Sequence, residues 1–251
     1  MRSFLQPLLI VLFFFVGACN APLLKQEMVQ FDRAFIPVFY YSYVGDVESA
    51  QKALPLLQRQ WQKVRMDFEQ ASTASDDWQE SIRLIGAWIE EAHCALRDGE
   101  AERALFQLDH ARYELMDLRW REGINDYYLD YAWELEATID IAISTSSDPM
   151  LKLLDWKEFV AISEDVNSSW QALQAQTVDQ QLYRIKGAKM LLLKERQQAM
   201  NTAILNFLRS VESADRLEFA ATAKALEPAY LNYINLFGDF ESIQTFYASI
   251  Q

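Results

Sequence analysis

The sequence predicts an all-α protein, folded as an elongated antiparallel bundle of about eight helices, and three observations support this class. After residue 24, apolar residues recur with the spacing of three and four that places them on one face of a helix. Turn signals separate long runs, whereas in an all-β chain they would return about every eight to twelve residues. Hydrophobic residues make up 51% of the chain, with only seven glycines and six prolines, which favours a globular body over a disordered one.

The expected helices follow from these signals in order. They cover residues 25–44, 46–71, 76–97, 100–121, 126–145, 149–175, 179–211 and 215–237. Four glycines that can adopt the left-handed conformation of a helix end separate several of these runs, at positions 45, 99, 123 and 238. The pair Asp148 and Pro149 is typical of an N-cap and a first helical position. Three prolines inside expected helices remove a backbone donor, so we expect a kink or an interruption at positions 37, 55 and 228.

Two neighbouring helices carry continuous apolar seams. The seam of residues 76–97 consists of Trp78, Ile82, Ile85, Ile89, Ala92 and Leu96. The seam of residues 100–121 consists of Ala101, Ala104, Leu108, Ala111, Leu115 and Leu118. Seams with this spacing pack against partner helices. Because only Asp98 and Gly99 separate the two helices, we expect an antiparallel hairpin, each arm about 33 Å long at roughly 1.5 Å per residue.

The first 18 residues have the order of a secretory signal peptide. Positively charged Arg2 precedes a largely apolar run over residues 4–16, and the small residues Gly17 and Ala18 follow it. The run is shorter than the roughly 20 residues that a membrane-spanning helix needs. We therefore expect residues 1–18 to be removed from the mature protein.

The tetrad Val16, Gly17, Ala18 and Cys19 resembles the lipobox of bacterial lipoproteins. The resemblance covers only the first 19 residues. It implies that Cys19 becomes the first mature residue and carries a diacylglycerol and an N-acyl chain, which together anchor a protein to a membrane. Residues 19–25 would then form the lipidated N-terminus and a short tether, and residues 26–251 the helical domain. Asn20 stands where an aspartate favours the inner membrane in enteric lipoproteins, which implies the outer membrane, facing the periplasm.

The charge of the chain disfavours nucleic acid as a partner. The formal net charge is −13, and removal of residues 1–18 takes away one positive charge, that of Arg2, which gives −14. An acidic body of this kind without a basic patch is repelled by nucleic acid and by anionic headgroups. Lipidation of Cys19 would leave Cys94 as a lone thiol, so no intramolecular disulfide is expected.

The sequence contains none of the common catalytic or phosphate-binding motifs, and we expect neither enzymatic activity nor a bound cofactor other than the lipid on Cys19. The two histidines offer weak metal candidates. Glu90 and His93 have the Glu-x-x-His spacing of di-iron bundles, but the second such pair that these sites need is missing. His110 and Glu114 form an i, i+4 pair. A structural His93 beside the core and a solvated His110 are the favoured interpretations.

The densest polar stretch covers residues 110–136. Its guanidinium groups beside tyrosines could hold a carboxylate or sugar ligand, and the residues in question are Arg112, Arg119, Arg121, Asp126 and Asp130. Ion pairs between opposed helices are the favoured alternative, because long bundles use positions beside a seam for pairing.

Three hypotheses about function follow. The first is a membrane-anchored periplasmic lipoprotein whose helical bundle binds or scaffolds another component of the cell envelope. The second is an accessory protein that holds a metal ion or haem among its helices. The third, a helical enzyme that uses carboxylates and tyrosines of residues 112–134, has no substrate suggested by the sequence.

Overall fold

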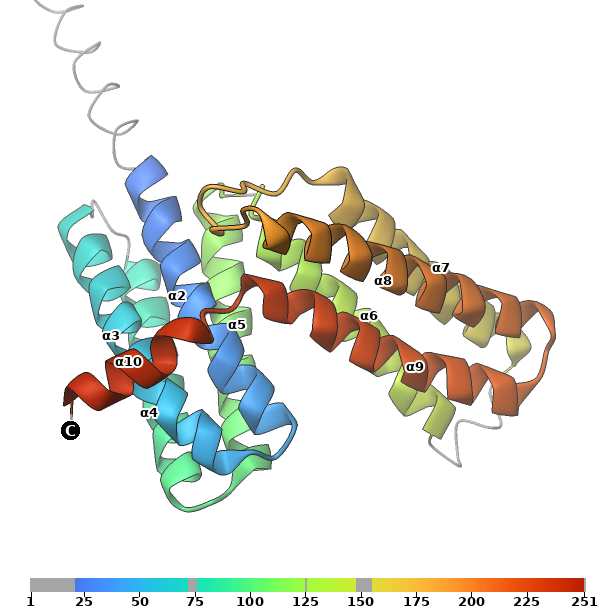
Figure 1. Cartoon of the computed structure of the whole chain (residues 1–251), viewed down its shortest axis with the longest axis horizontal. Helices are drawn as coiled ribbons and strands as arrows, with labels where there is room; N and C mark the ends of the chain where they lie inside the picture. Colours follow the sequence, from blue (N-terminus) through green and yellow to red (C-terminus); the bar gives the residue numbers. More distant parts are fainter. Residues whose placement is uncertain (1–20, 72–75, 125, 148–154, 251) are drawn as a thin grey trace, which may run out of the picture. The chain divides into compact units, whose positions relative to one another are not determined.

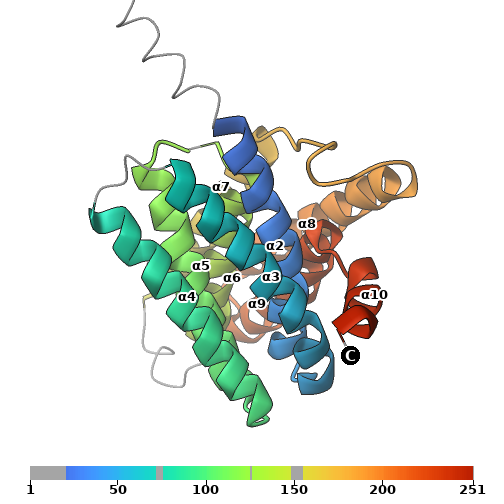
Figure 2. The same ribbon diagram turned by 90° about the vertical axis from the view of Figure 1, so that its left-hand side faces the viewer.

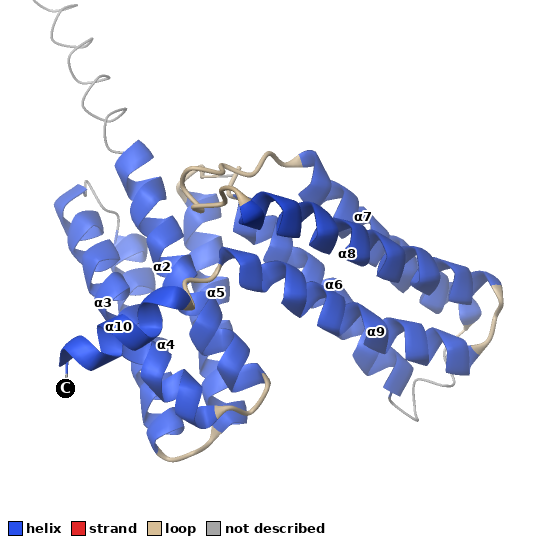
Figure 3. Cartoon of the chain, viewed as in Figure 1, coloured by secondary structure: helices blue, strands red, loops and turns tan. Residues whose placement is uncertain are grey.

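The computed structural model describes residues 21–71, 76–124, 126–147 and 155–250. All regular secondary structure in these ranges is helical (Figure 3), which confirms the all-α prediction. Cys19, Asn20 and the expected cap formed by Asp148 and Pro149 lie outside the described residues. No helix in the described ranges has the length and apolar character needed to span a bilayer.

Most helices begin and end within a few residues of the expected positions; the starts of α7 and α8 differ more, and α10 is additional. In order they are α2 (Ala21–Tyr43), α3 (Val47–Ala71), α4 (Asp76–Arg97), α5 (Ala101–Arg121), α6 (Tyr128–Ser147), α7 (Trp156–Ala175), α8 (Ala188–Glu212), α9 (Arg216–Ile234), the 3₁₀ helix η2 (Asn235–Phe237) and α10 (Glu241–Ile250) (Figure 1). Three of the four predicted terminator glycines have positive φ, Gly45, Gly99 and Gly123. The helices α2, α3 and α9 continue through their prolines without interruption.

The chain divides into two compact units. Unit 1 comprises residues 1–118 and 238–251, and unit 2 comprises residues 119–237. The boundary falls inside α5, after Leu118, where no linker marks it. The sequence, which predicts one helical domain over residues 26–251, therefore gives no sign of this division.

The core of unit 1 is built on α2 and on the two predicted seams. Phe31, Phe35 and Phe39 form a ladder along α2, with ring centroids 5.8 and 6.0 Å apart. Every residue of the α4 seam is buried, and so is the α5 seam from Ala104 to Leu118. The hairpin prediction is confirmed, since Arg103 Nη2 lies 3.4 Å from Glu91 Oε2 and the two helices run side by side (Figure 2).

The C-terminal helix α10 belongs to unit 1, where it packs against α3, and the sequence analysis did not anticipate it. Asp239 fixes its start: the backbone N–H donates to the Arg33 carbonyl at 2.7 Å, and the carboxylate accepts from Ser242 N at 3.2 Å. Gly238 does not adopt the predicted left-handed conformation. It is needed for space, because a Cβ there would lie 2.6 Å from the Phe240 ring.

Unit 2 contains α6 to α9 around a buried aromatic cluster. The rings of Tyr128, Tyr183 and Tyr233 each pack against Phe237, and the hydroxyls of Tyr128 and Tyr233 are hydrogen-bonded. Burial raises the pKa of Tyr128 to about 12. The helix expected to start at residue 179 begins only at Ala188, because Tyr183 turns inward to join this cluster.

Candidate functional site

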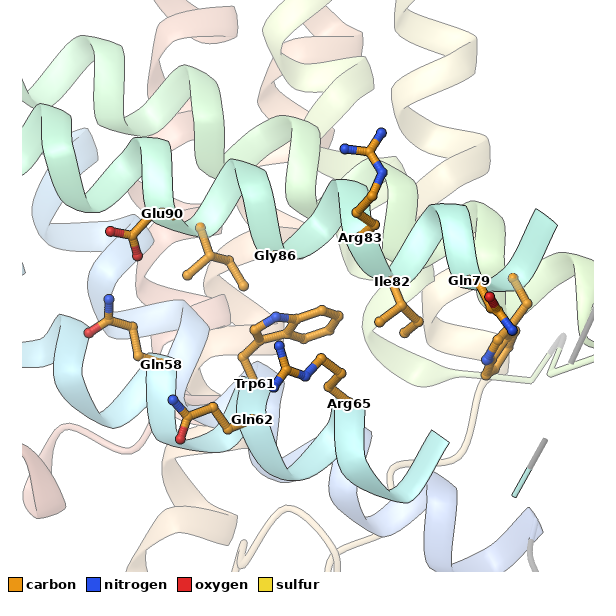
Figure 4. A pocket seen from close by; sticks show the side chains of 11 residues that line it. Gln58, Trp61, Gln62, Arg65, Gln79, Ile82, Arg83, Gly86 and Glu90 are labelled. Atoms are coloured by element: carbon orange, nitrogen blue, oxygen red, sulfur yellow. The ribbon is translucent and has the colours of Figure 1, made fainter. Parts of the chain in front are cut away.

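A groove between α3 and α4 of unit 1 is the best candidate for a binding site. It encloses about 800 Å³, which lies within the range of small-ligand sites. Its lining residues recur every three or four positions, so each helix contributes a single face. They are Gln58, Trp61, Gln62 and Arg65 of α3, with Trp78, Gln79, Ile82, Arg83, Gly86, Ile89 and Glu90 of α4 (Figure 4).

Trp61 and Gly86 form the centre of the groove. Trp61 is only 6% exposed and is backed by the Phe31 ring, in an edge-on contact with centroids 5.7 Å apart. A Cβ at Gly86 would lie 3.1 Å from Trp61 Nε1, so only glycine lets the indole approach α4 this closely. Glycine inside a helix costs about 1 kcal/mol relative to alanine. The close packing of the indole offsets that cost.

The rim of the groove is polar. Gln62, Arg65 and Gln79 are exposed, and Gln58 is half-buried. Figure 4 shows Arg65 reaching back along α3 beside Trp61, whereas Arg83 points away from α3. Arg83 is held on that outer side by Glu80, with Nε 2.8 Å from Oε2 and Nη2 2.6 Å from Oε1. Of the two lining arginines, Arg65 is therefore the one that places its charge over the groove.

The predicted pair Glu90 and His93 lies at one end of this groove. His93 Nδ1 is 3.4 Å from Glu90 Oε1 and 3.3 Å from Gln58 Nε2, so α3 supplies a further contact to the imidazole. Among the described residues, no three His, Cys, Asp or Glu side chains come together in a way that could hold a metal ion. Glu90 thus contributes polar atoms to the groove, and His93 contacts two of its lining residues, Glu90 and Gln58.

The second predicted metal pair, His110 and Glu114, lies on a different helix, α5. His110 is half-buried between Trp88 and Phe106, with ring centroids 4.9 and 4.3 Å away. Its Nδ1 lies 2.8 Å from the Phe106 carbonyl oxygen, to which it donates. The Trp88 ring of α4 packs against the His110 ring, which is why His110 is less exposed to solvent than the sequence suggested. Glu114 is half-buried on the same helix.

Charged residues of the stretch 110–136 make ion pairs in both units. In unit 1, buried Arg112 binds Asp109 at 2.6 Å and lies over the Phe39 ring. Burial raises the pKa of Asp109, and Arg112 partly opposes that rise.

In unit 2, Arg119 binds both carboxylate oxygens of Asp130, through Nε at 2.9 Å and through Nη2. Its guanidinium carbon lies 4.2 Å from the centre of the Tyr127 ring, and Arg119 itself is 1% exposed. Burial raises the pKa of Asp130, and the charge of Arg119 offsets part of the rise. Arg121 and Asp126 are exposed. Arg119 and Asp130 thus form the kind of interhelical ion pair that the sequence analysis favoured.

The spacing of residues along the chain does not reveal the groove. It places Trp78, Ile82 and Ile89 on the seam of a helix and gives Gly86 no particular role. An isolated glycine inside a strong helical pattern is the one signal that could have indicated a close approach of another group. The partner of that glycine, Trp61, could not be named without knowing how α3 pairs with α4.

Comparison with protein-family models, curated proteins and solved structures finds no match to this chain. The groove geometry and the N-terminal sequence are therefore the observations that bear on function.

Proposed function

We propose that the protein is a periplasmic lipoprotein, anchored by acyl chains on Cys19, whose helical body binds another component of the cell envelope. The anchor is supported by the order of charge, apolar run and lipobox-like tetrad in residues 1–19. Asn20 supports the outer membrane as its location. Two or more acyl chains give stable attachment, whereas one gives only transient binding.

The groove between α3 and α4 is the observation that carries the binding part of this proposal. It combines a buried apolar floor at Trp61 with exposed side chains that can make hydrogen bonds, as ligand sites do. Packing between two helices of a bundle normally fills such a space with apolar side chains. Here glutamines and charged residues share the lining with Trp61, Trp78, Ile82 and Ile89.

Site-specific photo-crosslinking in intact envelopes tests the proposal. A photoreactive residue at Gln62, on the groove rim, should capture one defined envelope component. The same residue at Gln198, an exposed glutamine of α8, is the matched control and should capture none or a different set. The variant C19S should lose its acyl chains by mass spectrometry and leave the membrane fraction. Equal capture from both positions, or an unmodified Cys19 in the wild-type protein, would contradict the proposal.

A further inference from the structure

A basic segment surrounds the start of α8 in unit 2. Residues 184–196 include five basic residues and one acidic residue, which gives this segment a charge of +4 in a chain whose net charge is −13. The basic residues are Arg184, Lys186, Lys189, Lys194 and Arg196. No acidic residue stands in the first turn of α8 to oppose them. The net charge of the whole chain gives no sign of this local excess of positive charge.

The loop that leads into α8 turns two of these basic side chains outward (Figure 3). Tyr183 and Ile185 are buried, whereas Arg184 and Lys186, which alternate with them, are exposed. The backbone N–H of Ile185 donates to the Gln180 carbonyl at 2.9 Å, which fixes the loop. Arg184 has a φ of 53°, a conformation that residues other than glycine rarely adopt. The buried neighbours therefore hold the two charges at the surface.

Two leucines near the start of α8 are exposed beside these charges. Leu191 is 71% exposed and Leu192 is 37% exposed. Lys194 is exposed as well, and it lies three positions after Leu191, so the two side chains are neighbours on the helix surface. Five side chains of this segment thus combine positive charge with exposed apolar surface. We call them the α8 patch: Arg184, Lys186, Leu191, Leu192 and Lys194.

This combination fits the surface of a bilayer that contains anionic lipids. Basic side chains contact the phosphates of the headgroups, and leucines enter the boundary between headgroups and acyl chains. Nucleic acid would bind the charges but would leave the leucines in water. The negative charge of the rest of the protein opposes the approach to such a surface. That repulsion is screened beyond about 8 Å at physiological ionic strength, whereas the patch would act in direct contact.

We propose that the α8 patch is a peripheral contact for bilayers with anionic phospholipids. The contact goes beyond the proposed function, because it needs neither the acyl chains on Cys19 nor the groove of unit 1. Glu195 is also exposed on α8 and reduces the local charge. The contact is therefore weak and depends strongly on salt, and it would orient a protein that another anchor keeps near the membrane.

Vesicle flotation of residues 19–251 carrying C19S tests the patch without an acyl chain. At low ionic strength this chain should float with vesicles that contain equal parts of phosphatidylglycerol and phosphatidylcholine. It should not float with vesicles of phosphatidylcholine alone. Raising the ionic strength to about 0.5 M should release it, because salt screens contacts between exposed charges.

Charge reversal at two positions of the patch tests the electrostatic part. K186E/K194E should lower the vesicle partition coefficient by about tenfold or more, because each basic side chain at an anionic surface contributes roughly fivefold. K157E/K224E is the matched control, since it makes the same change in net charge at exposed lysines of α7 and α9. The control should change the partition coefficient by less than about twofold.

Replacement of the leucines tests the apolar part. L191S/L192S should lower the partition coefficient by roughly fivefold, because the patch loses the side chains that enter the bilayer. L205S/L217S is the matched control, with leucines of α8 and α9 that are 51% and 82% exposed but lie outside the patch. The control should bind vesicles as the parent chain does. Circular dichroism should show the same helical content for all variants.

Three results would overturn the membrane contact: no flotation at low ionic strength, equal flotation with phosphatidylcholine alone, or equal effects of the patch variants and their controls. Binding to polyglutamate that K186E/K194E abolishes, without vesicle binding, would assign the patch to an acidic protein instead of a bilayer. None of these results bears on the proposed function, which is tested by the lipid on Cys19 and by capture at Gln62.

Discussion

The ion pair between buried Arg119 and half-buried Asp130 gives the sharpest stability prediction. Removing one partner of a buried ion pair costs about 3–5 kcal/mol, because the other charge stays buried without compensation. D130N should reach this range at neutral pH, where the wild-type carboxylate is ionised and the guanidinium of Arg119 keeps its proton. R119M should cost less at acidic pH, because burial already raises the pKa of Asp130 and the carboxyl can become neutral.

The pH dependence of R119M follows from the direction of that pKa shift. Without Arg119 the folded-state pKa of Asp130 rises further above its unfolded value, so the neutral carboxyl is favoured in the fold. The stability that the neutral Asp130 carboxyl contributes is present below the pKa of Asp130 in the unfolded state. It is lost as pH rises through the pKa of Asp130 in the folded state. The stability of R119M relative to the wild type should therefore fall between acidic and neutral pH, whereas D130N, which lacks the titrating carboxyl, should show no such fall.

Urea denaturation followed by circular dichroism measures these differences. The double variant R119M/D130L should recover to within about 1 kcal/mol of the wild type, because apolar replacements of a buried pair are often neutral. The exposed pair Arg83 and Glu80 is the matched control, and R83M should leave the stability close to that of the wild type. A D130N variant as stable as R83M, or an R119M variant with no relative pH dependence, would refute the reasoning.

Three further predictions concern other parts of the chain. The pKa of Tyr128 rises from 10.0 to about 12 on burial, so its contribution is intact below pH 10 and lost as pH rises toward 12. At pH 11 this amounts to roughly 1 kcal/mol, and Y128F should show a correspondingly flatter alkaline stability curve in urea denaturation. G86A should lose about 1 kcal/mol despite its better helix propensity, because Phe31 blocks retreat of the Trp61 indole; equal or higher stability would show that the indole can move. In a native host, C19S should fractionate as a soluble protein, and continued membrane association would point to another attachment.

The helices that the sequence predicted well are those whose signals are local. The seams of α4 and α5 need only the spacing of apolar residues, and Gly99 needs only the backbone geometry of a helix end. The start of α8 was predicted at residue 179 but lies at Ala188, and the reason is a tertiary contact. Tyr183 and Ile185 are buried at 4% and 1% exposure, and anchoring them holds residues 179–187 out of a helix.

The candidate site depended on pairing information that one sequence does not contain. Trp61 and Gly86 lie 25 positions apart, and neither their contact nor the groove around it has a periodic signature. The charged stretch at residues 110–136 drew attention because its charges are dense along the chain. In the structure Arg112 pairs with Asp109 inside unit 1 and Arg119 pairs with Asp130 inside unit 2, and which carboxylate each arginine binds could not be read from the density of charges along the chain.

The start of α2 at Ala21 bears on how the anchored protein would meet its partners. The predicted tether of residues 19–25 would have allowed roughly 20 Å of extended chain, but two residue steps from Cys19 to Ala21 span at most about 7 Å. With acyl chains on Cys19, unit 1 would be held against the bilayer through a rigid helix with almost no slack. The groove would then stay within a thin layer of periplasm next to the membrane. Envelope components in that layer would be at a high effective concentration for the groove, and components outside it could not reach the groove.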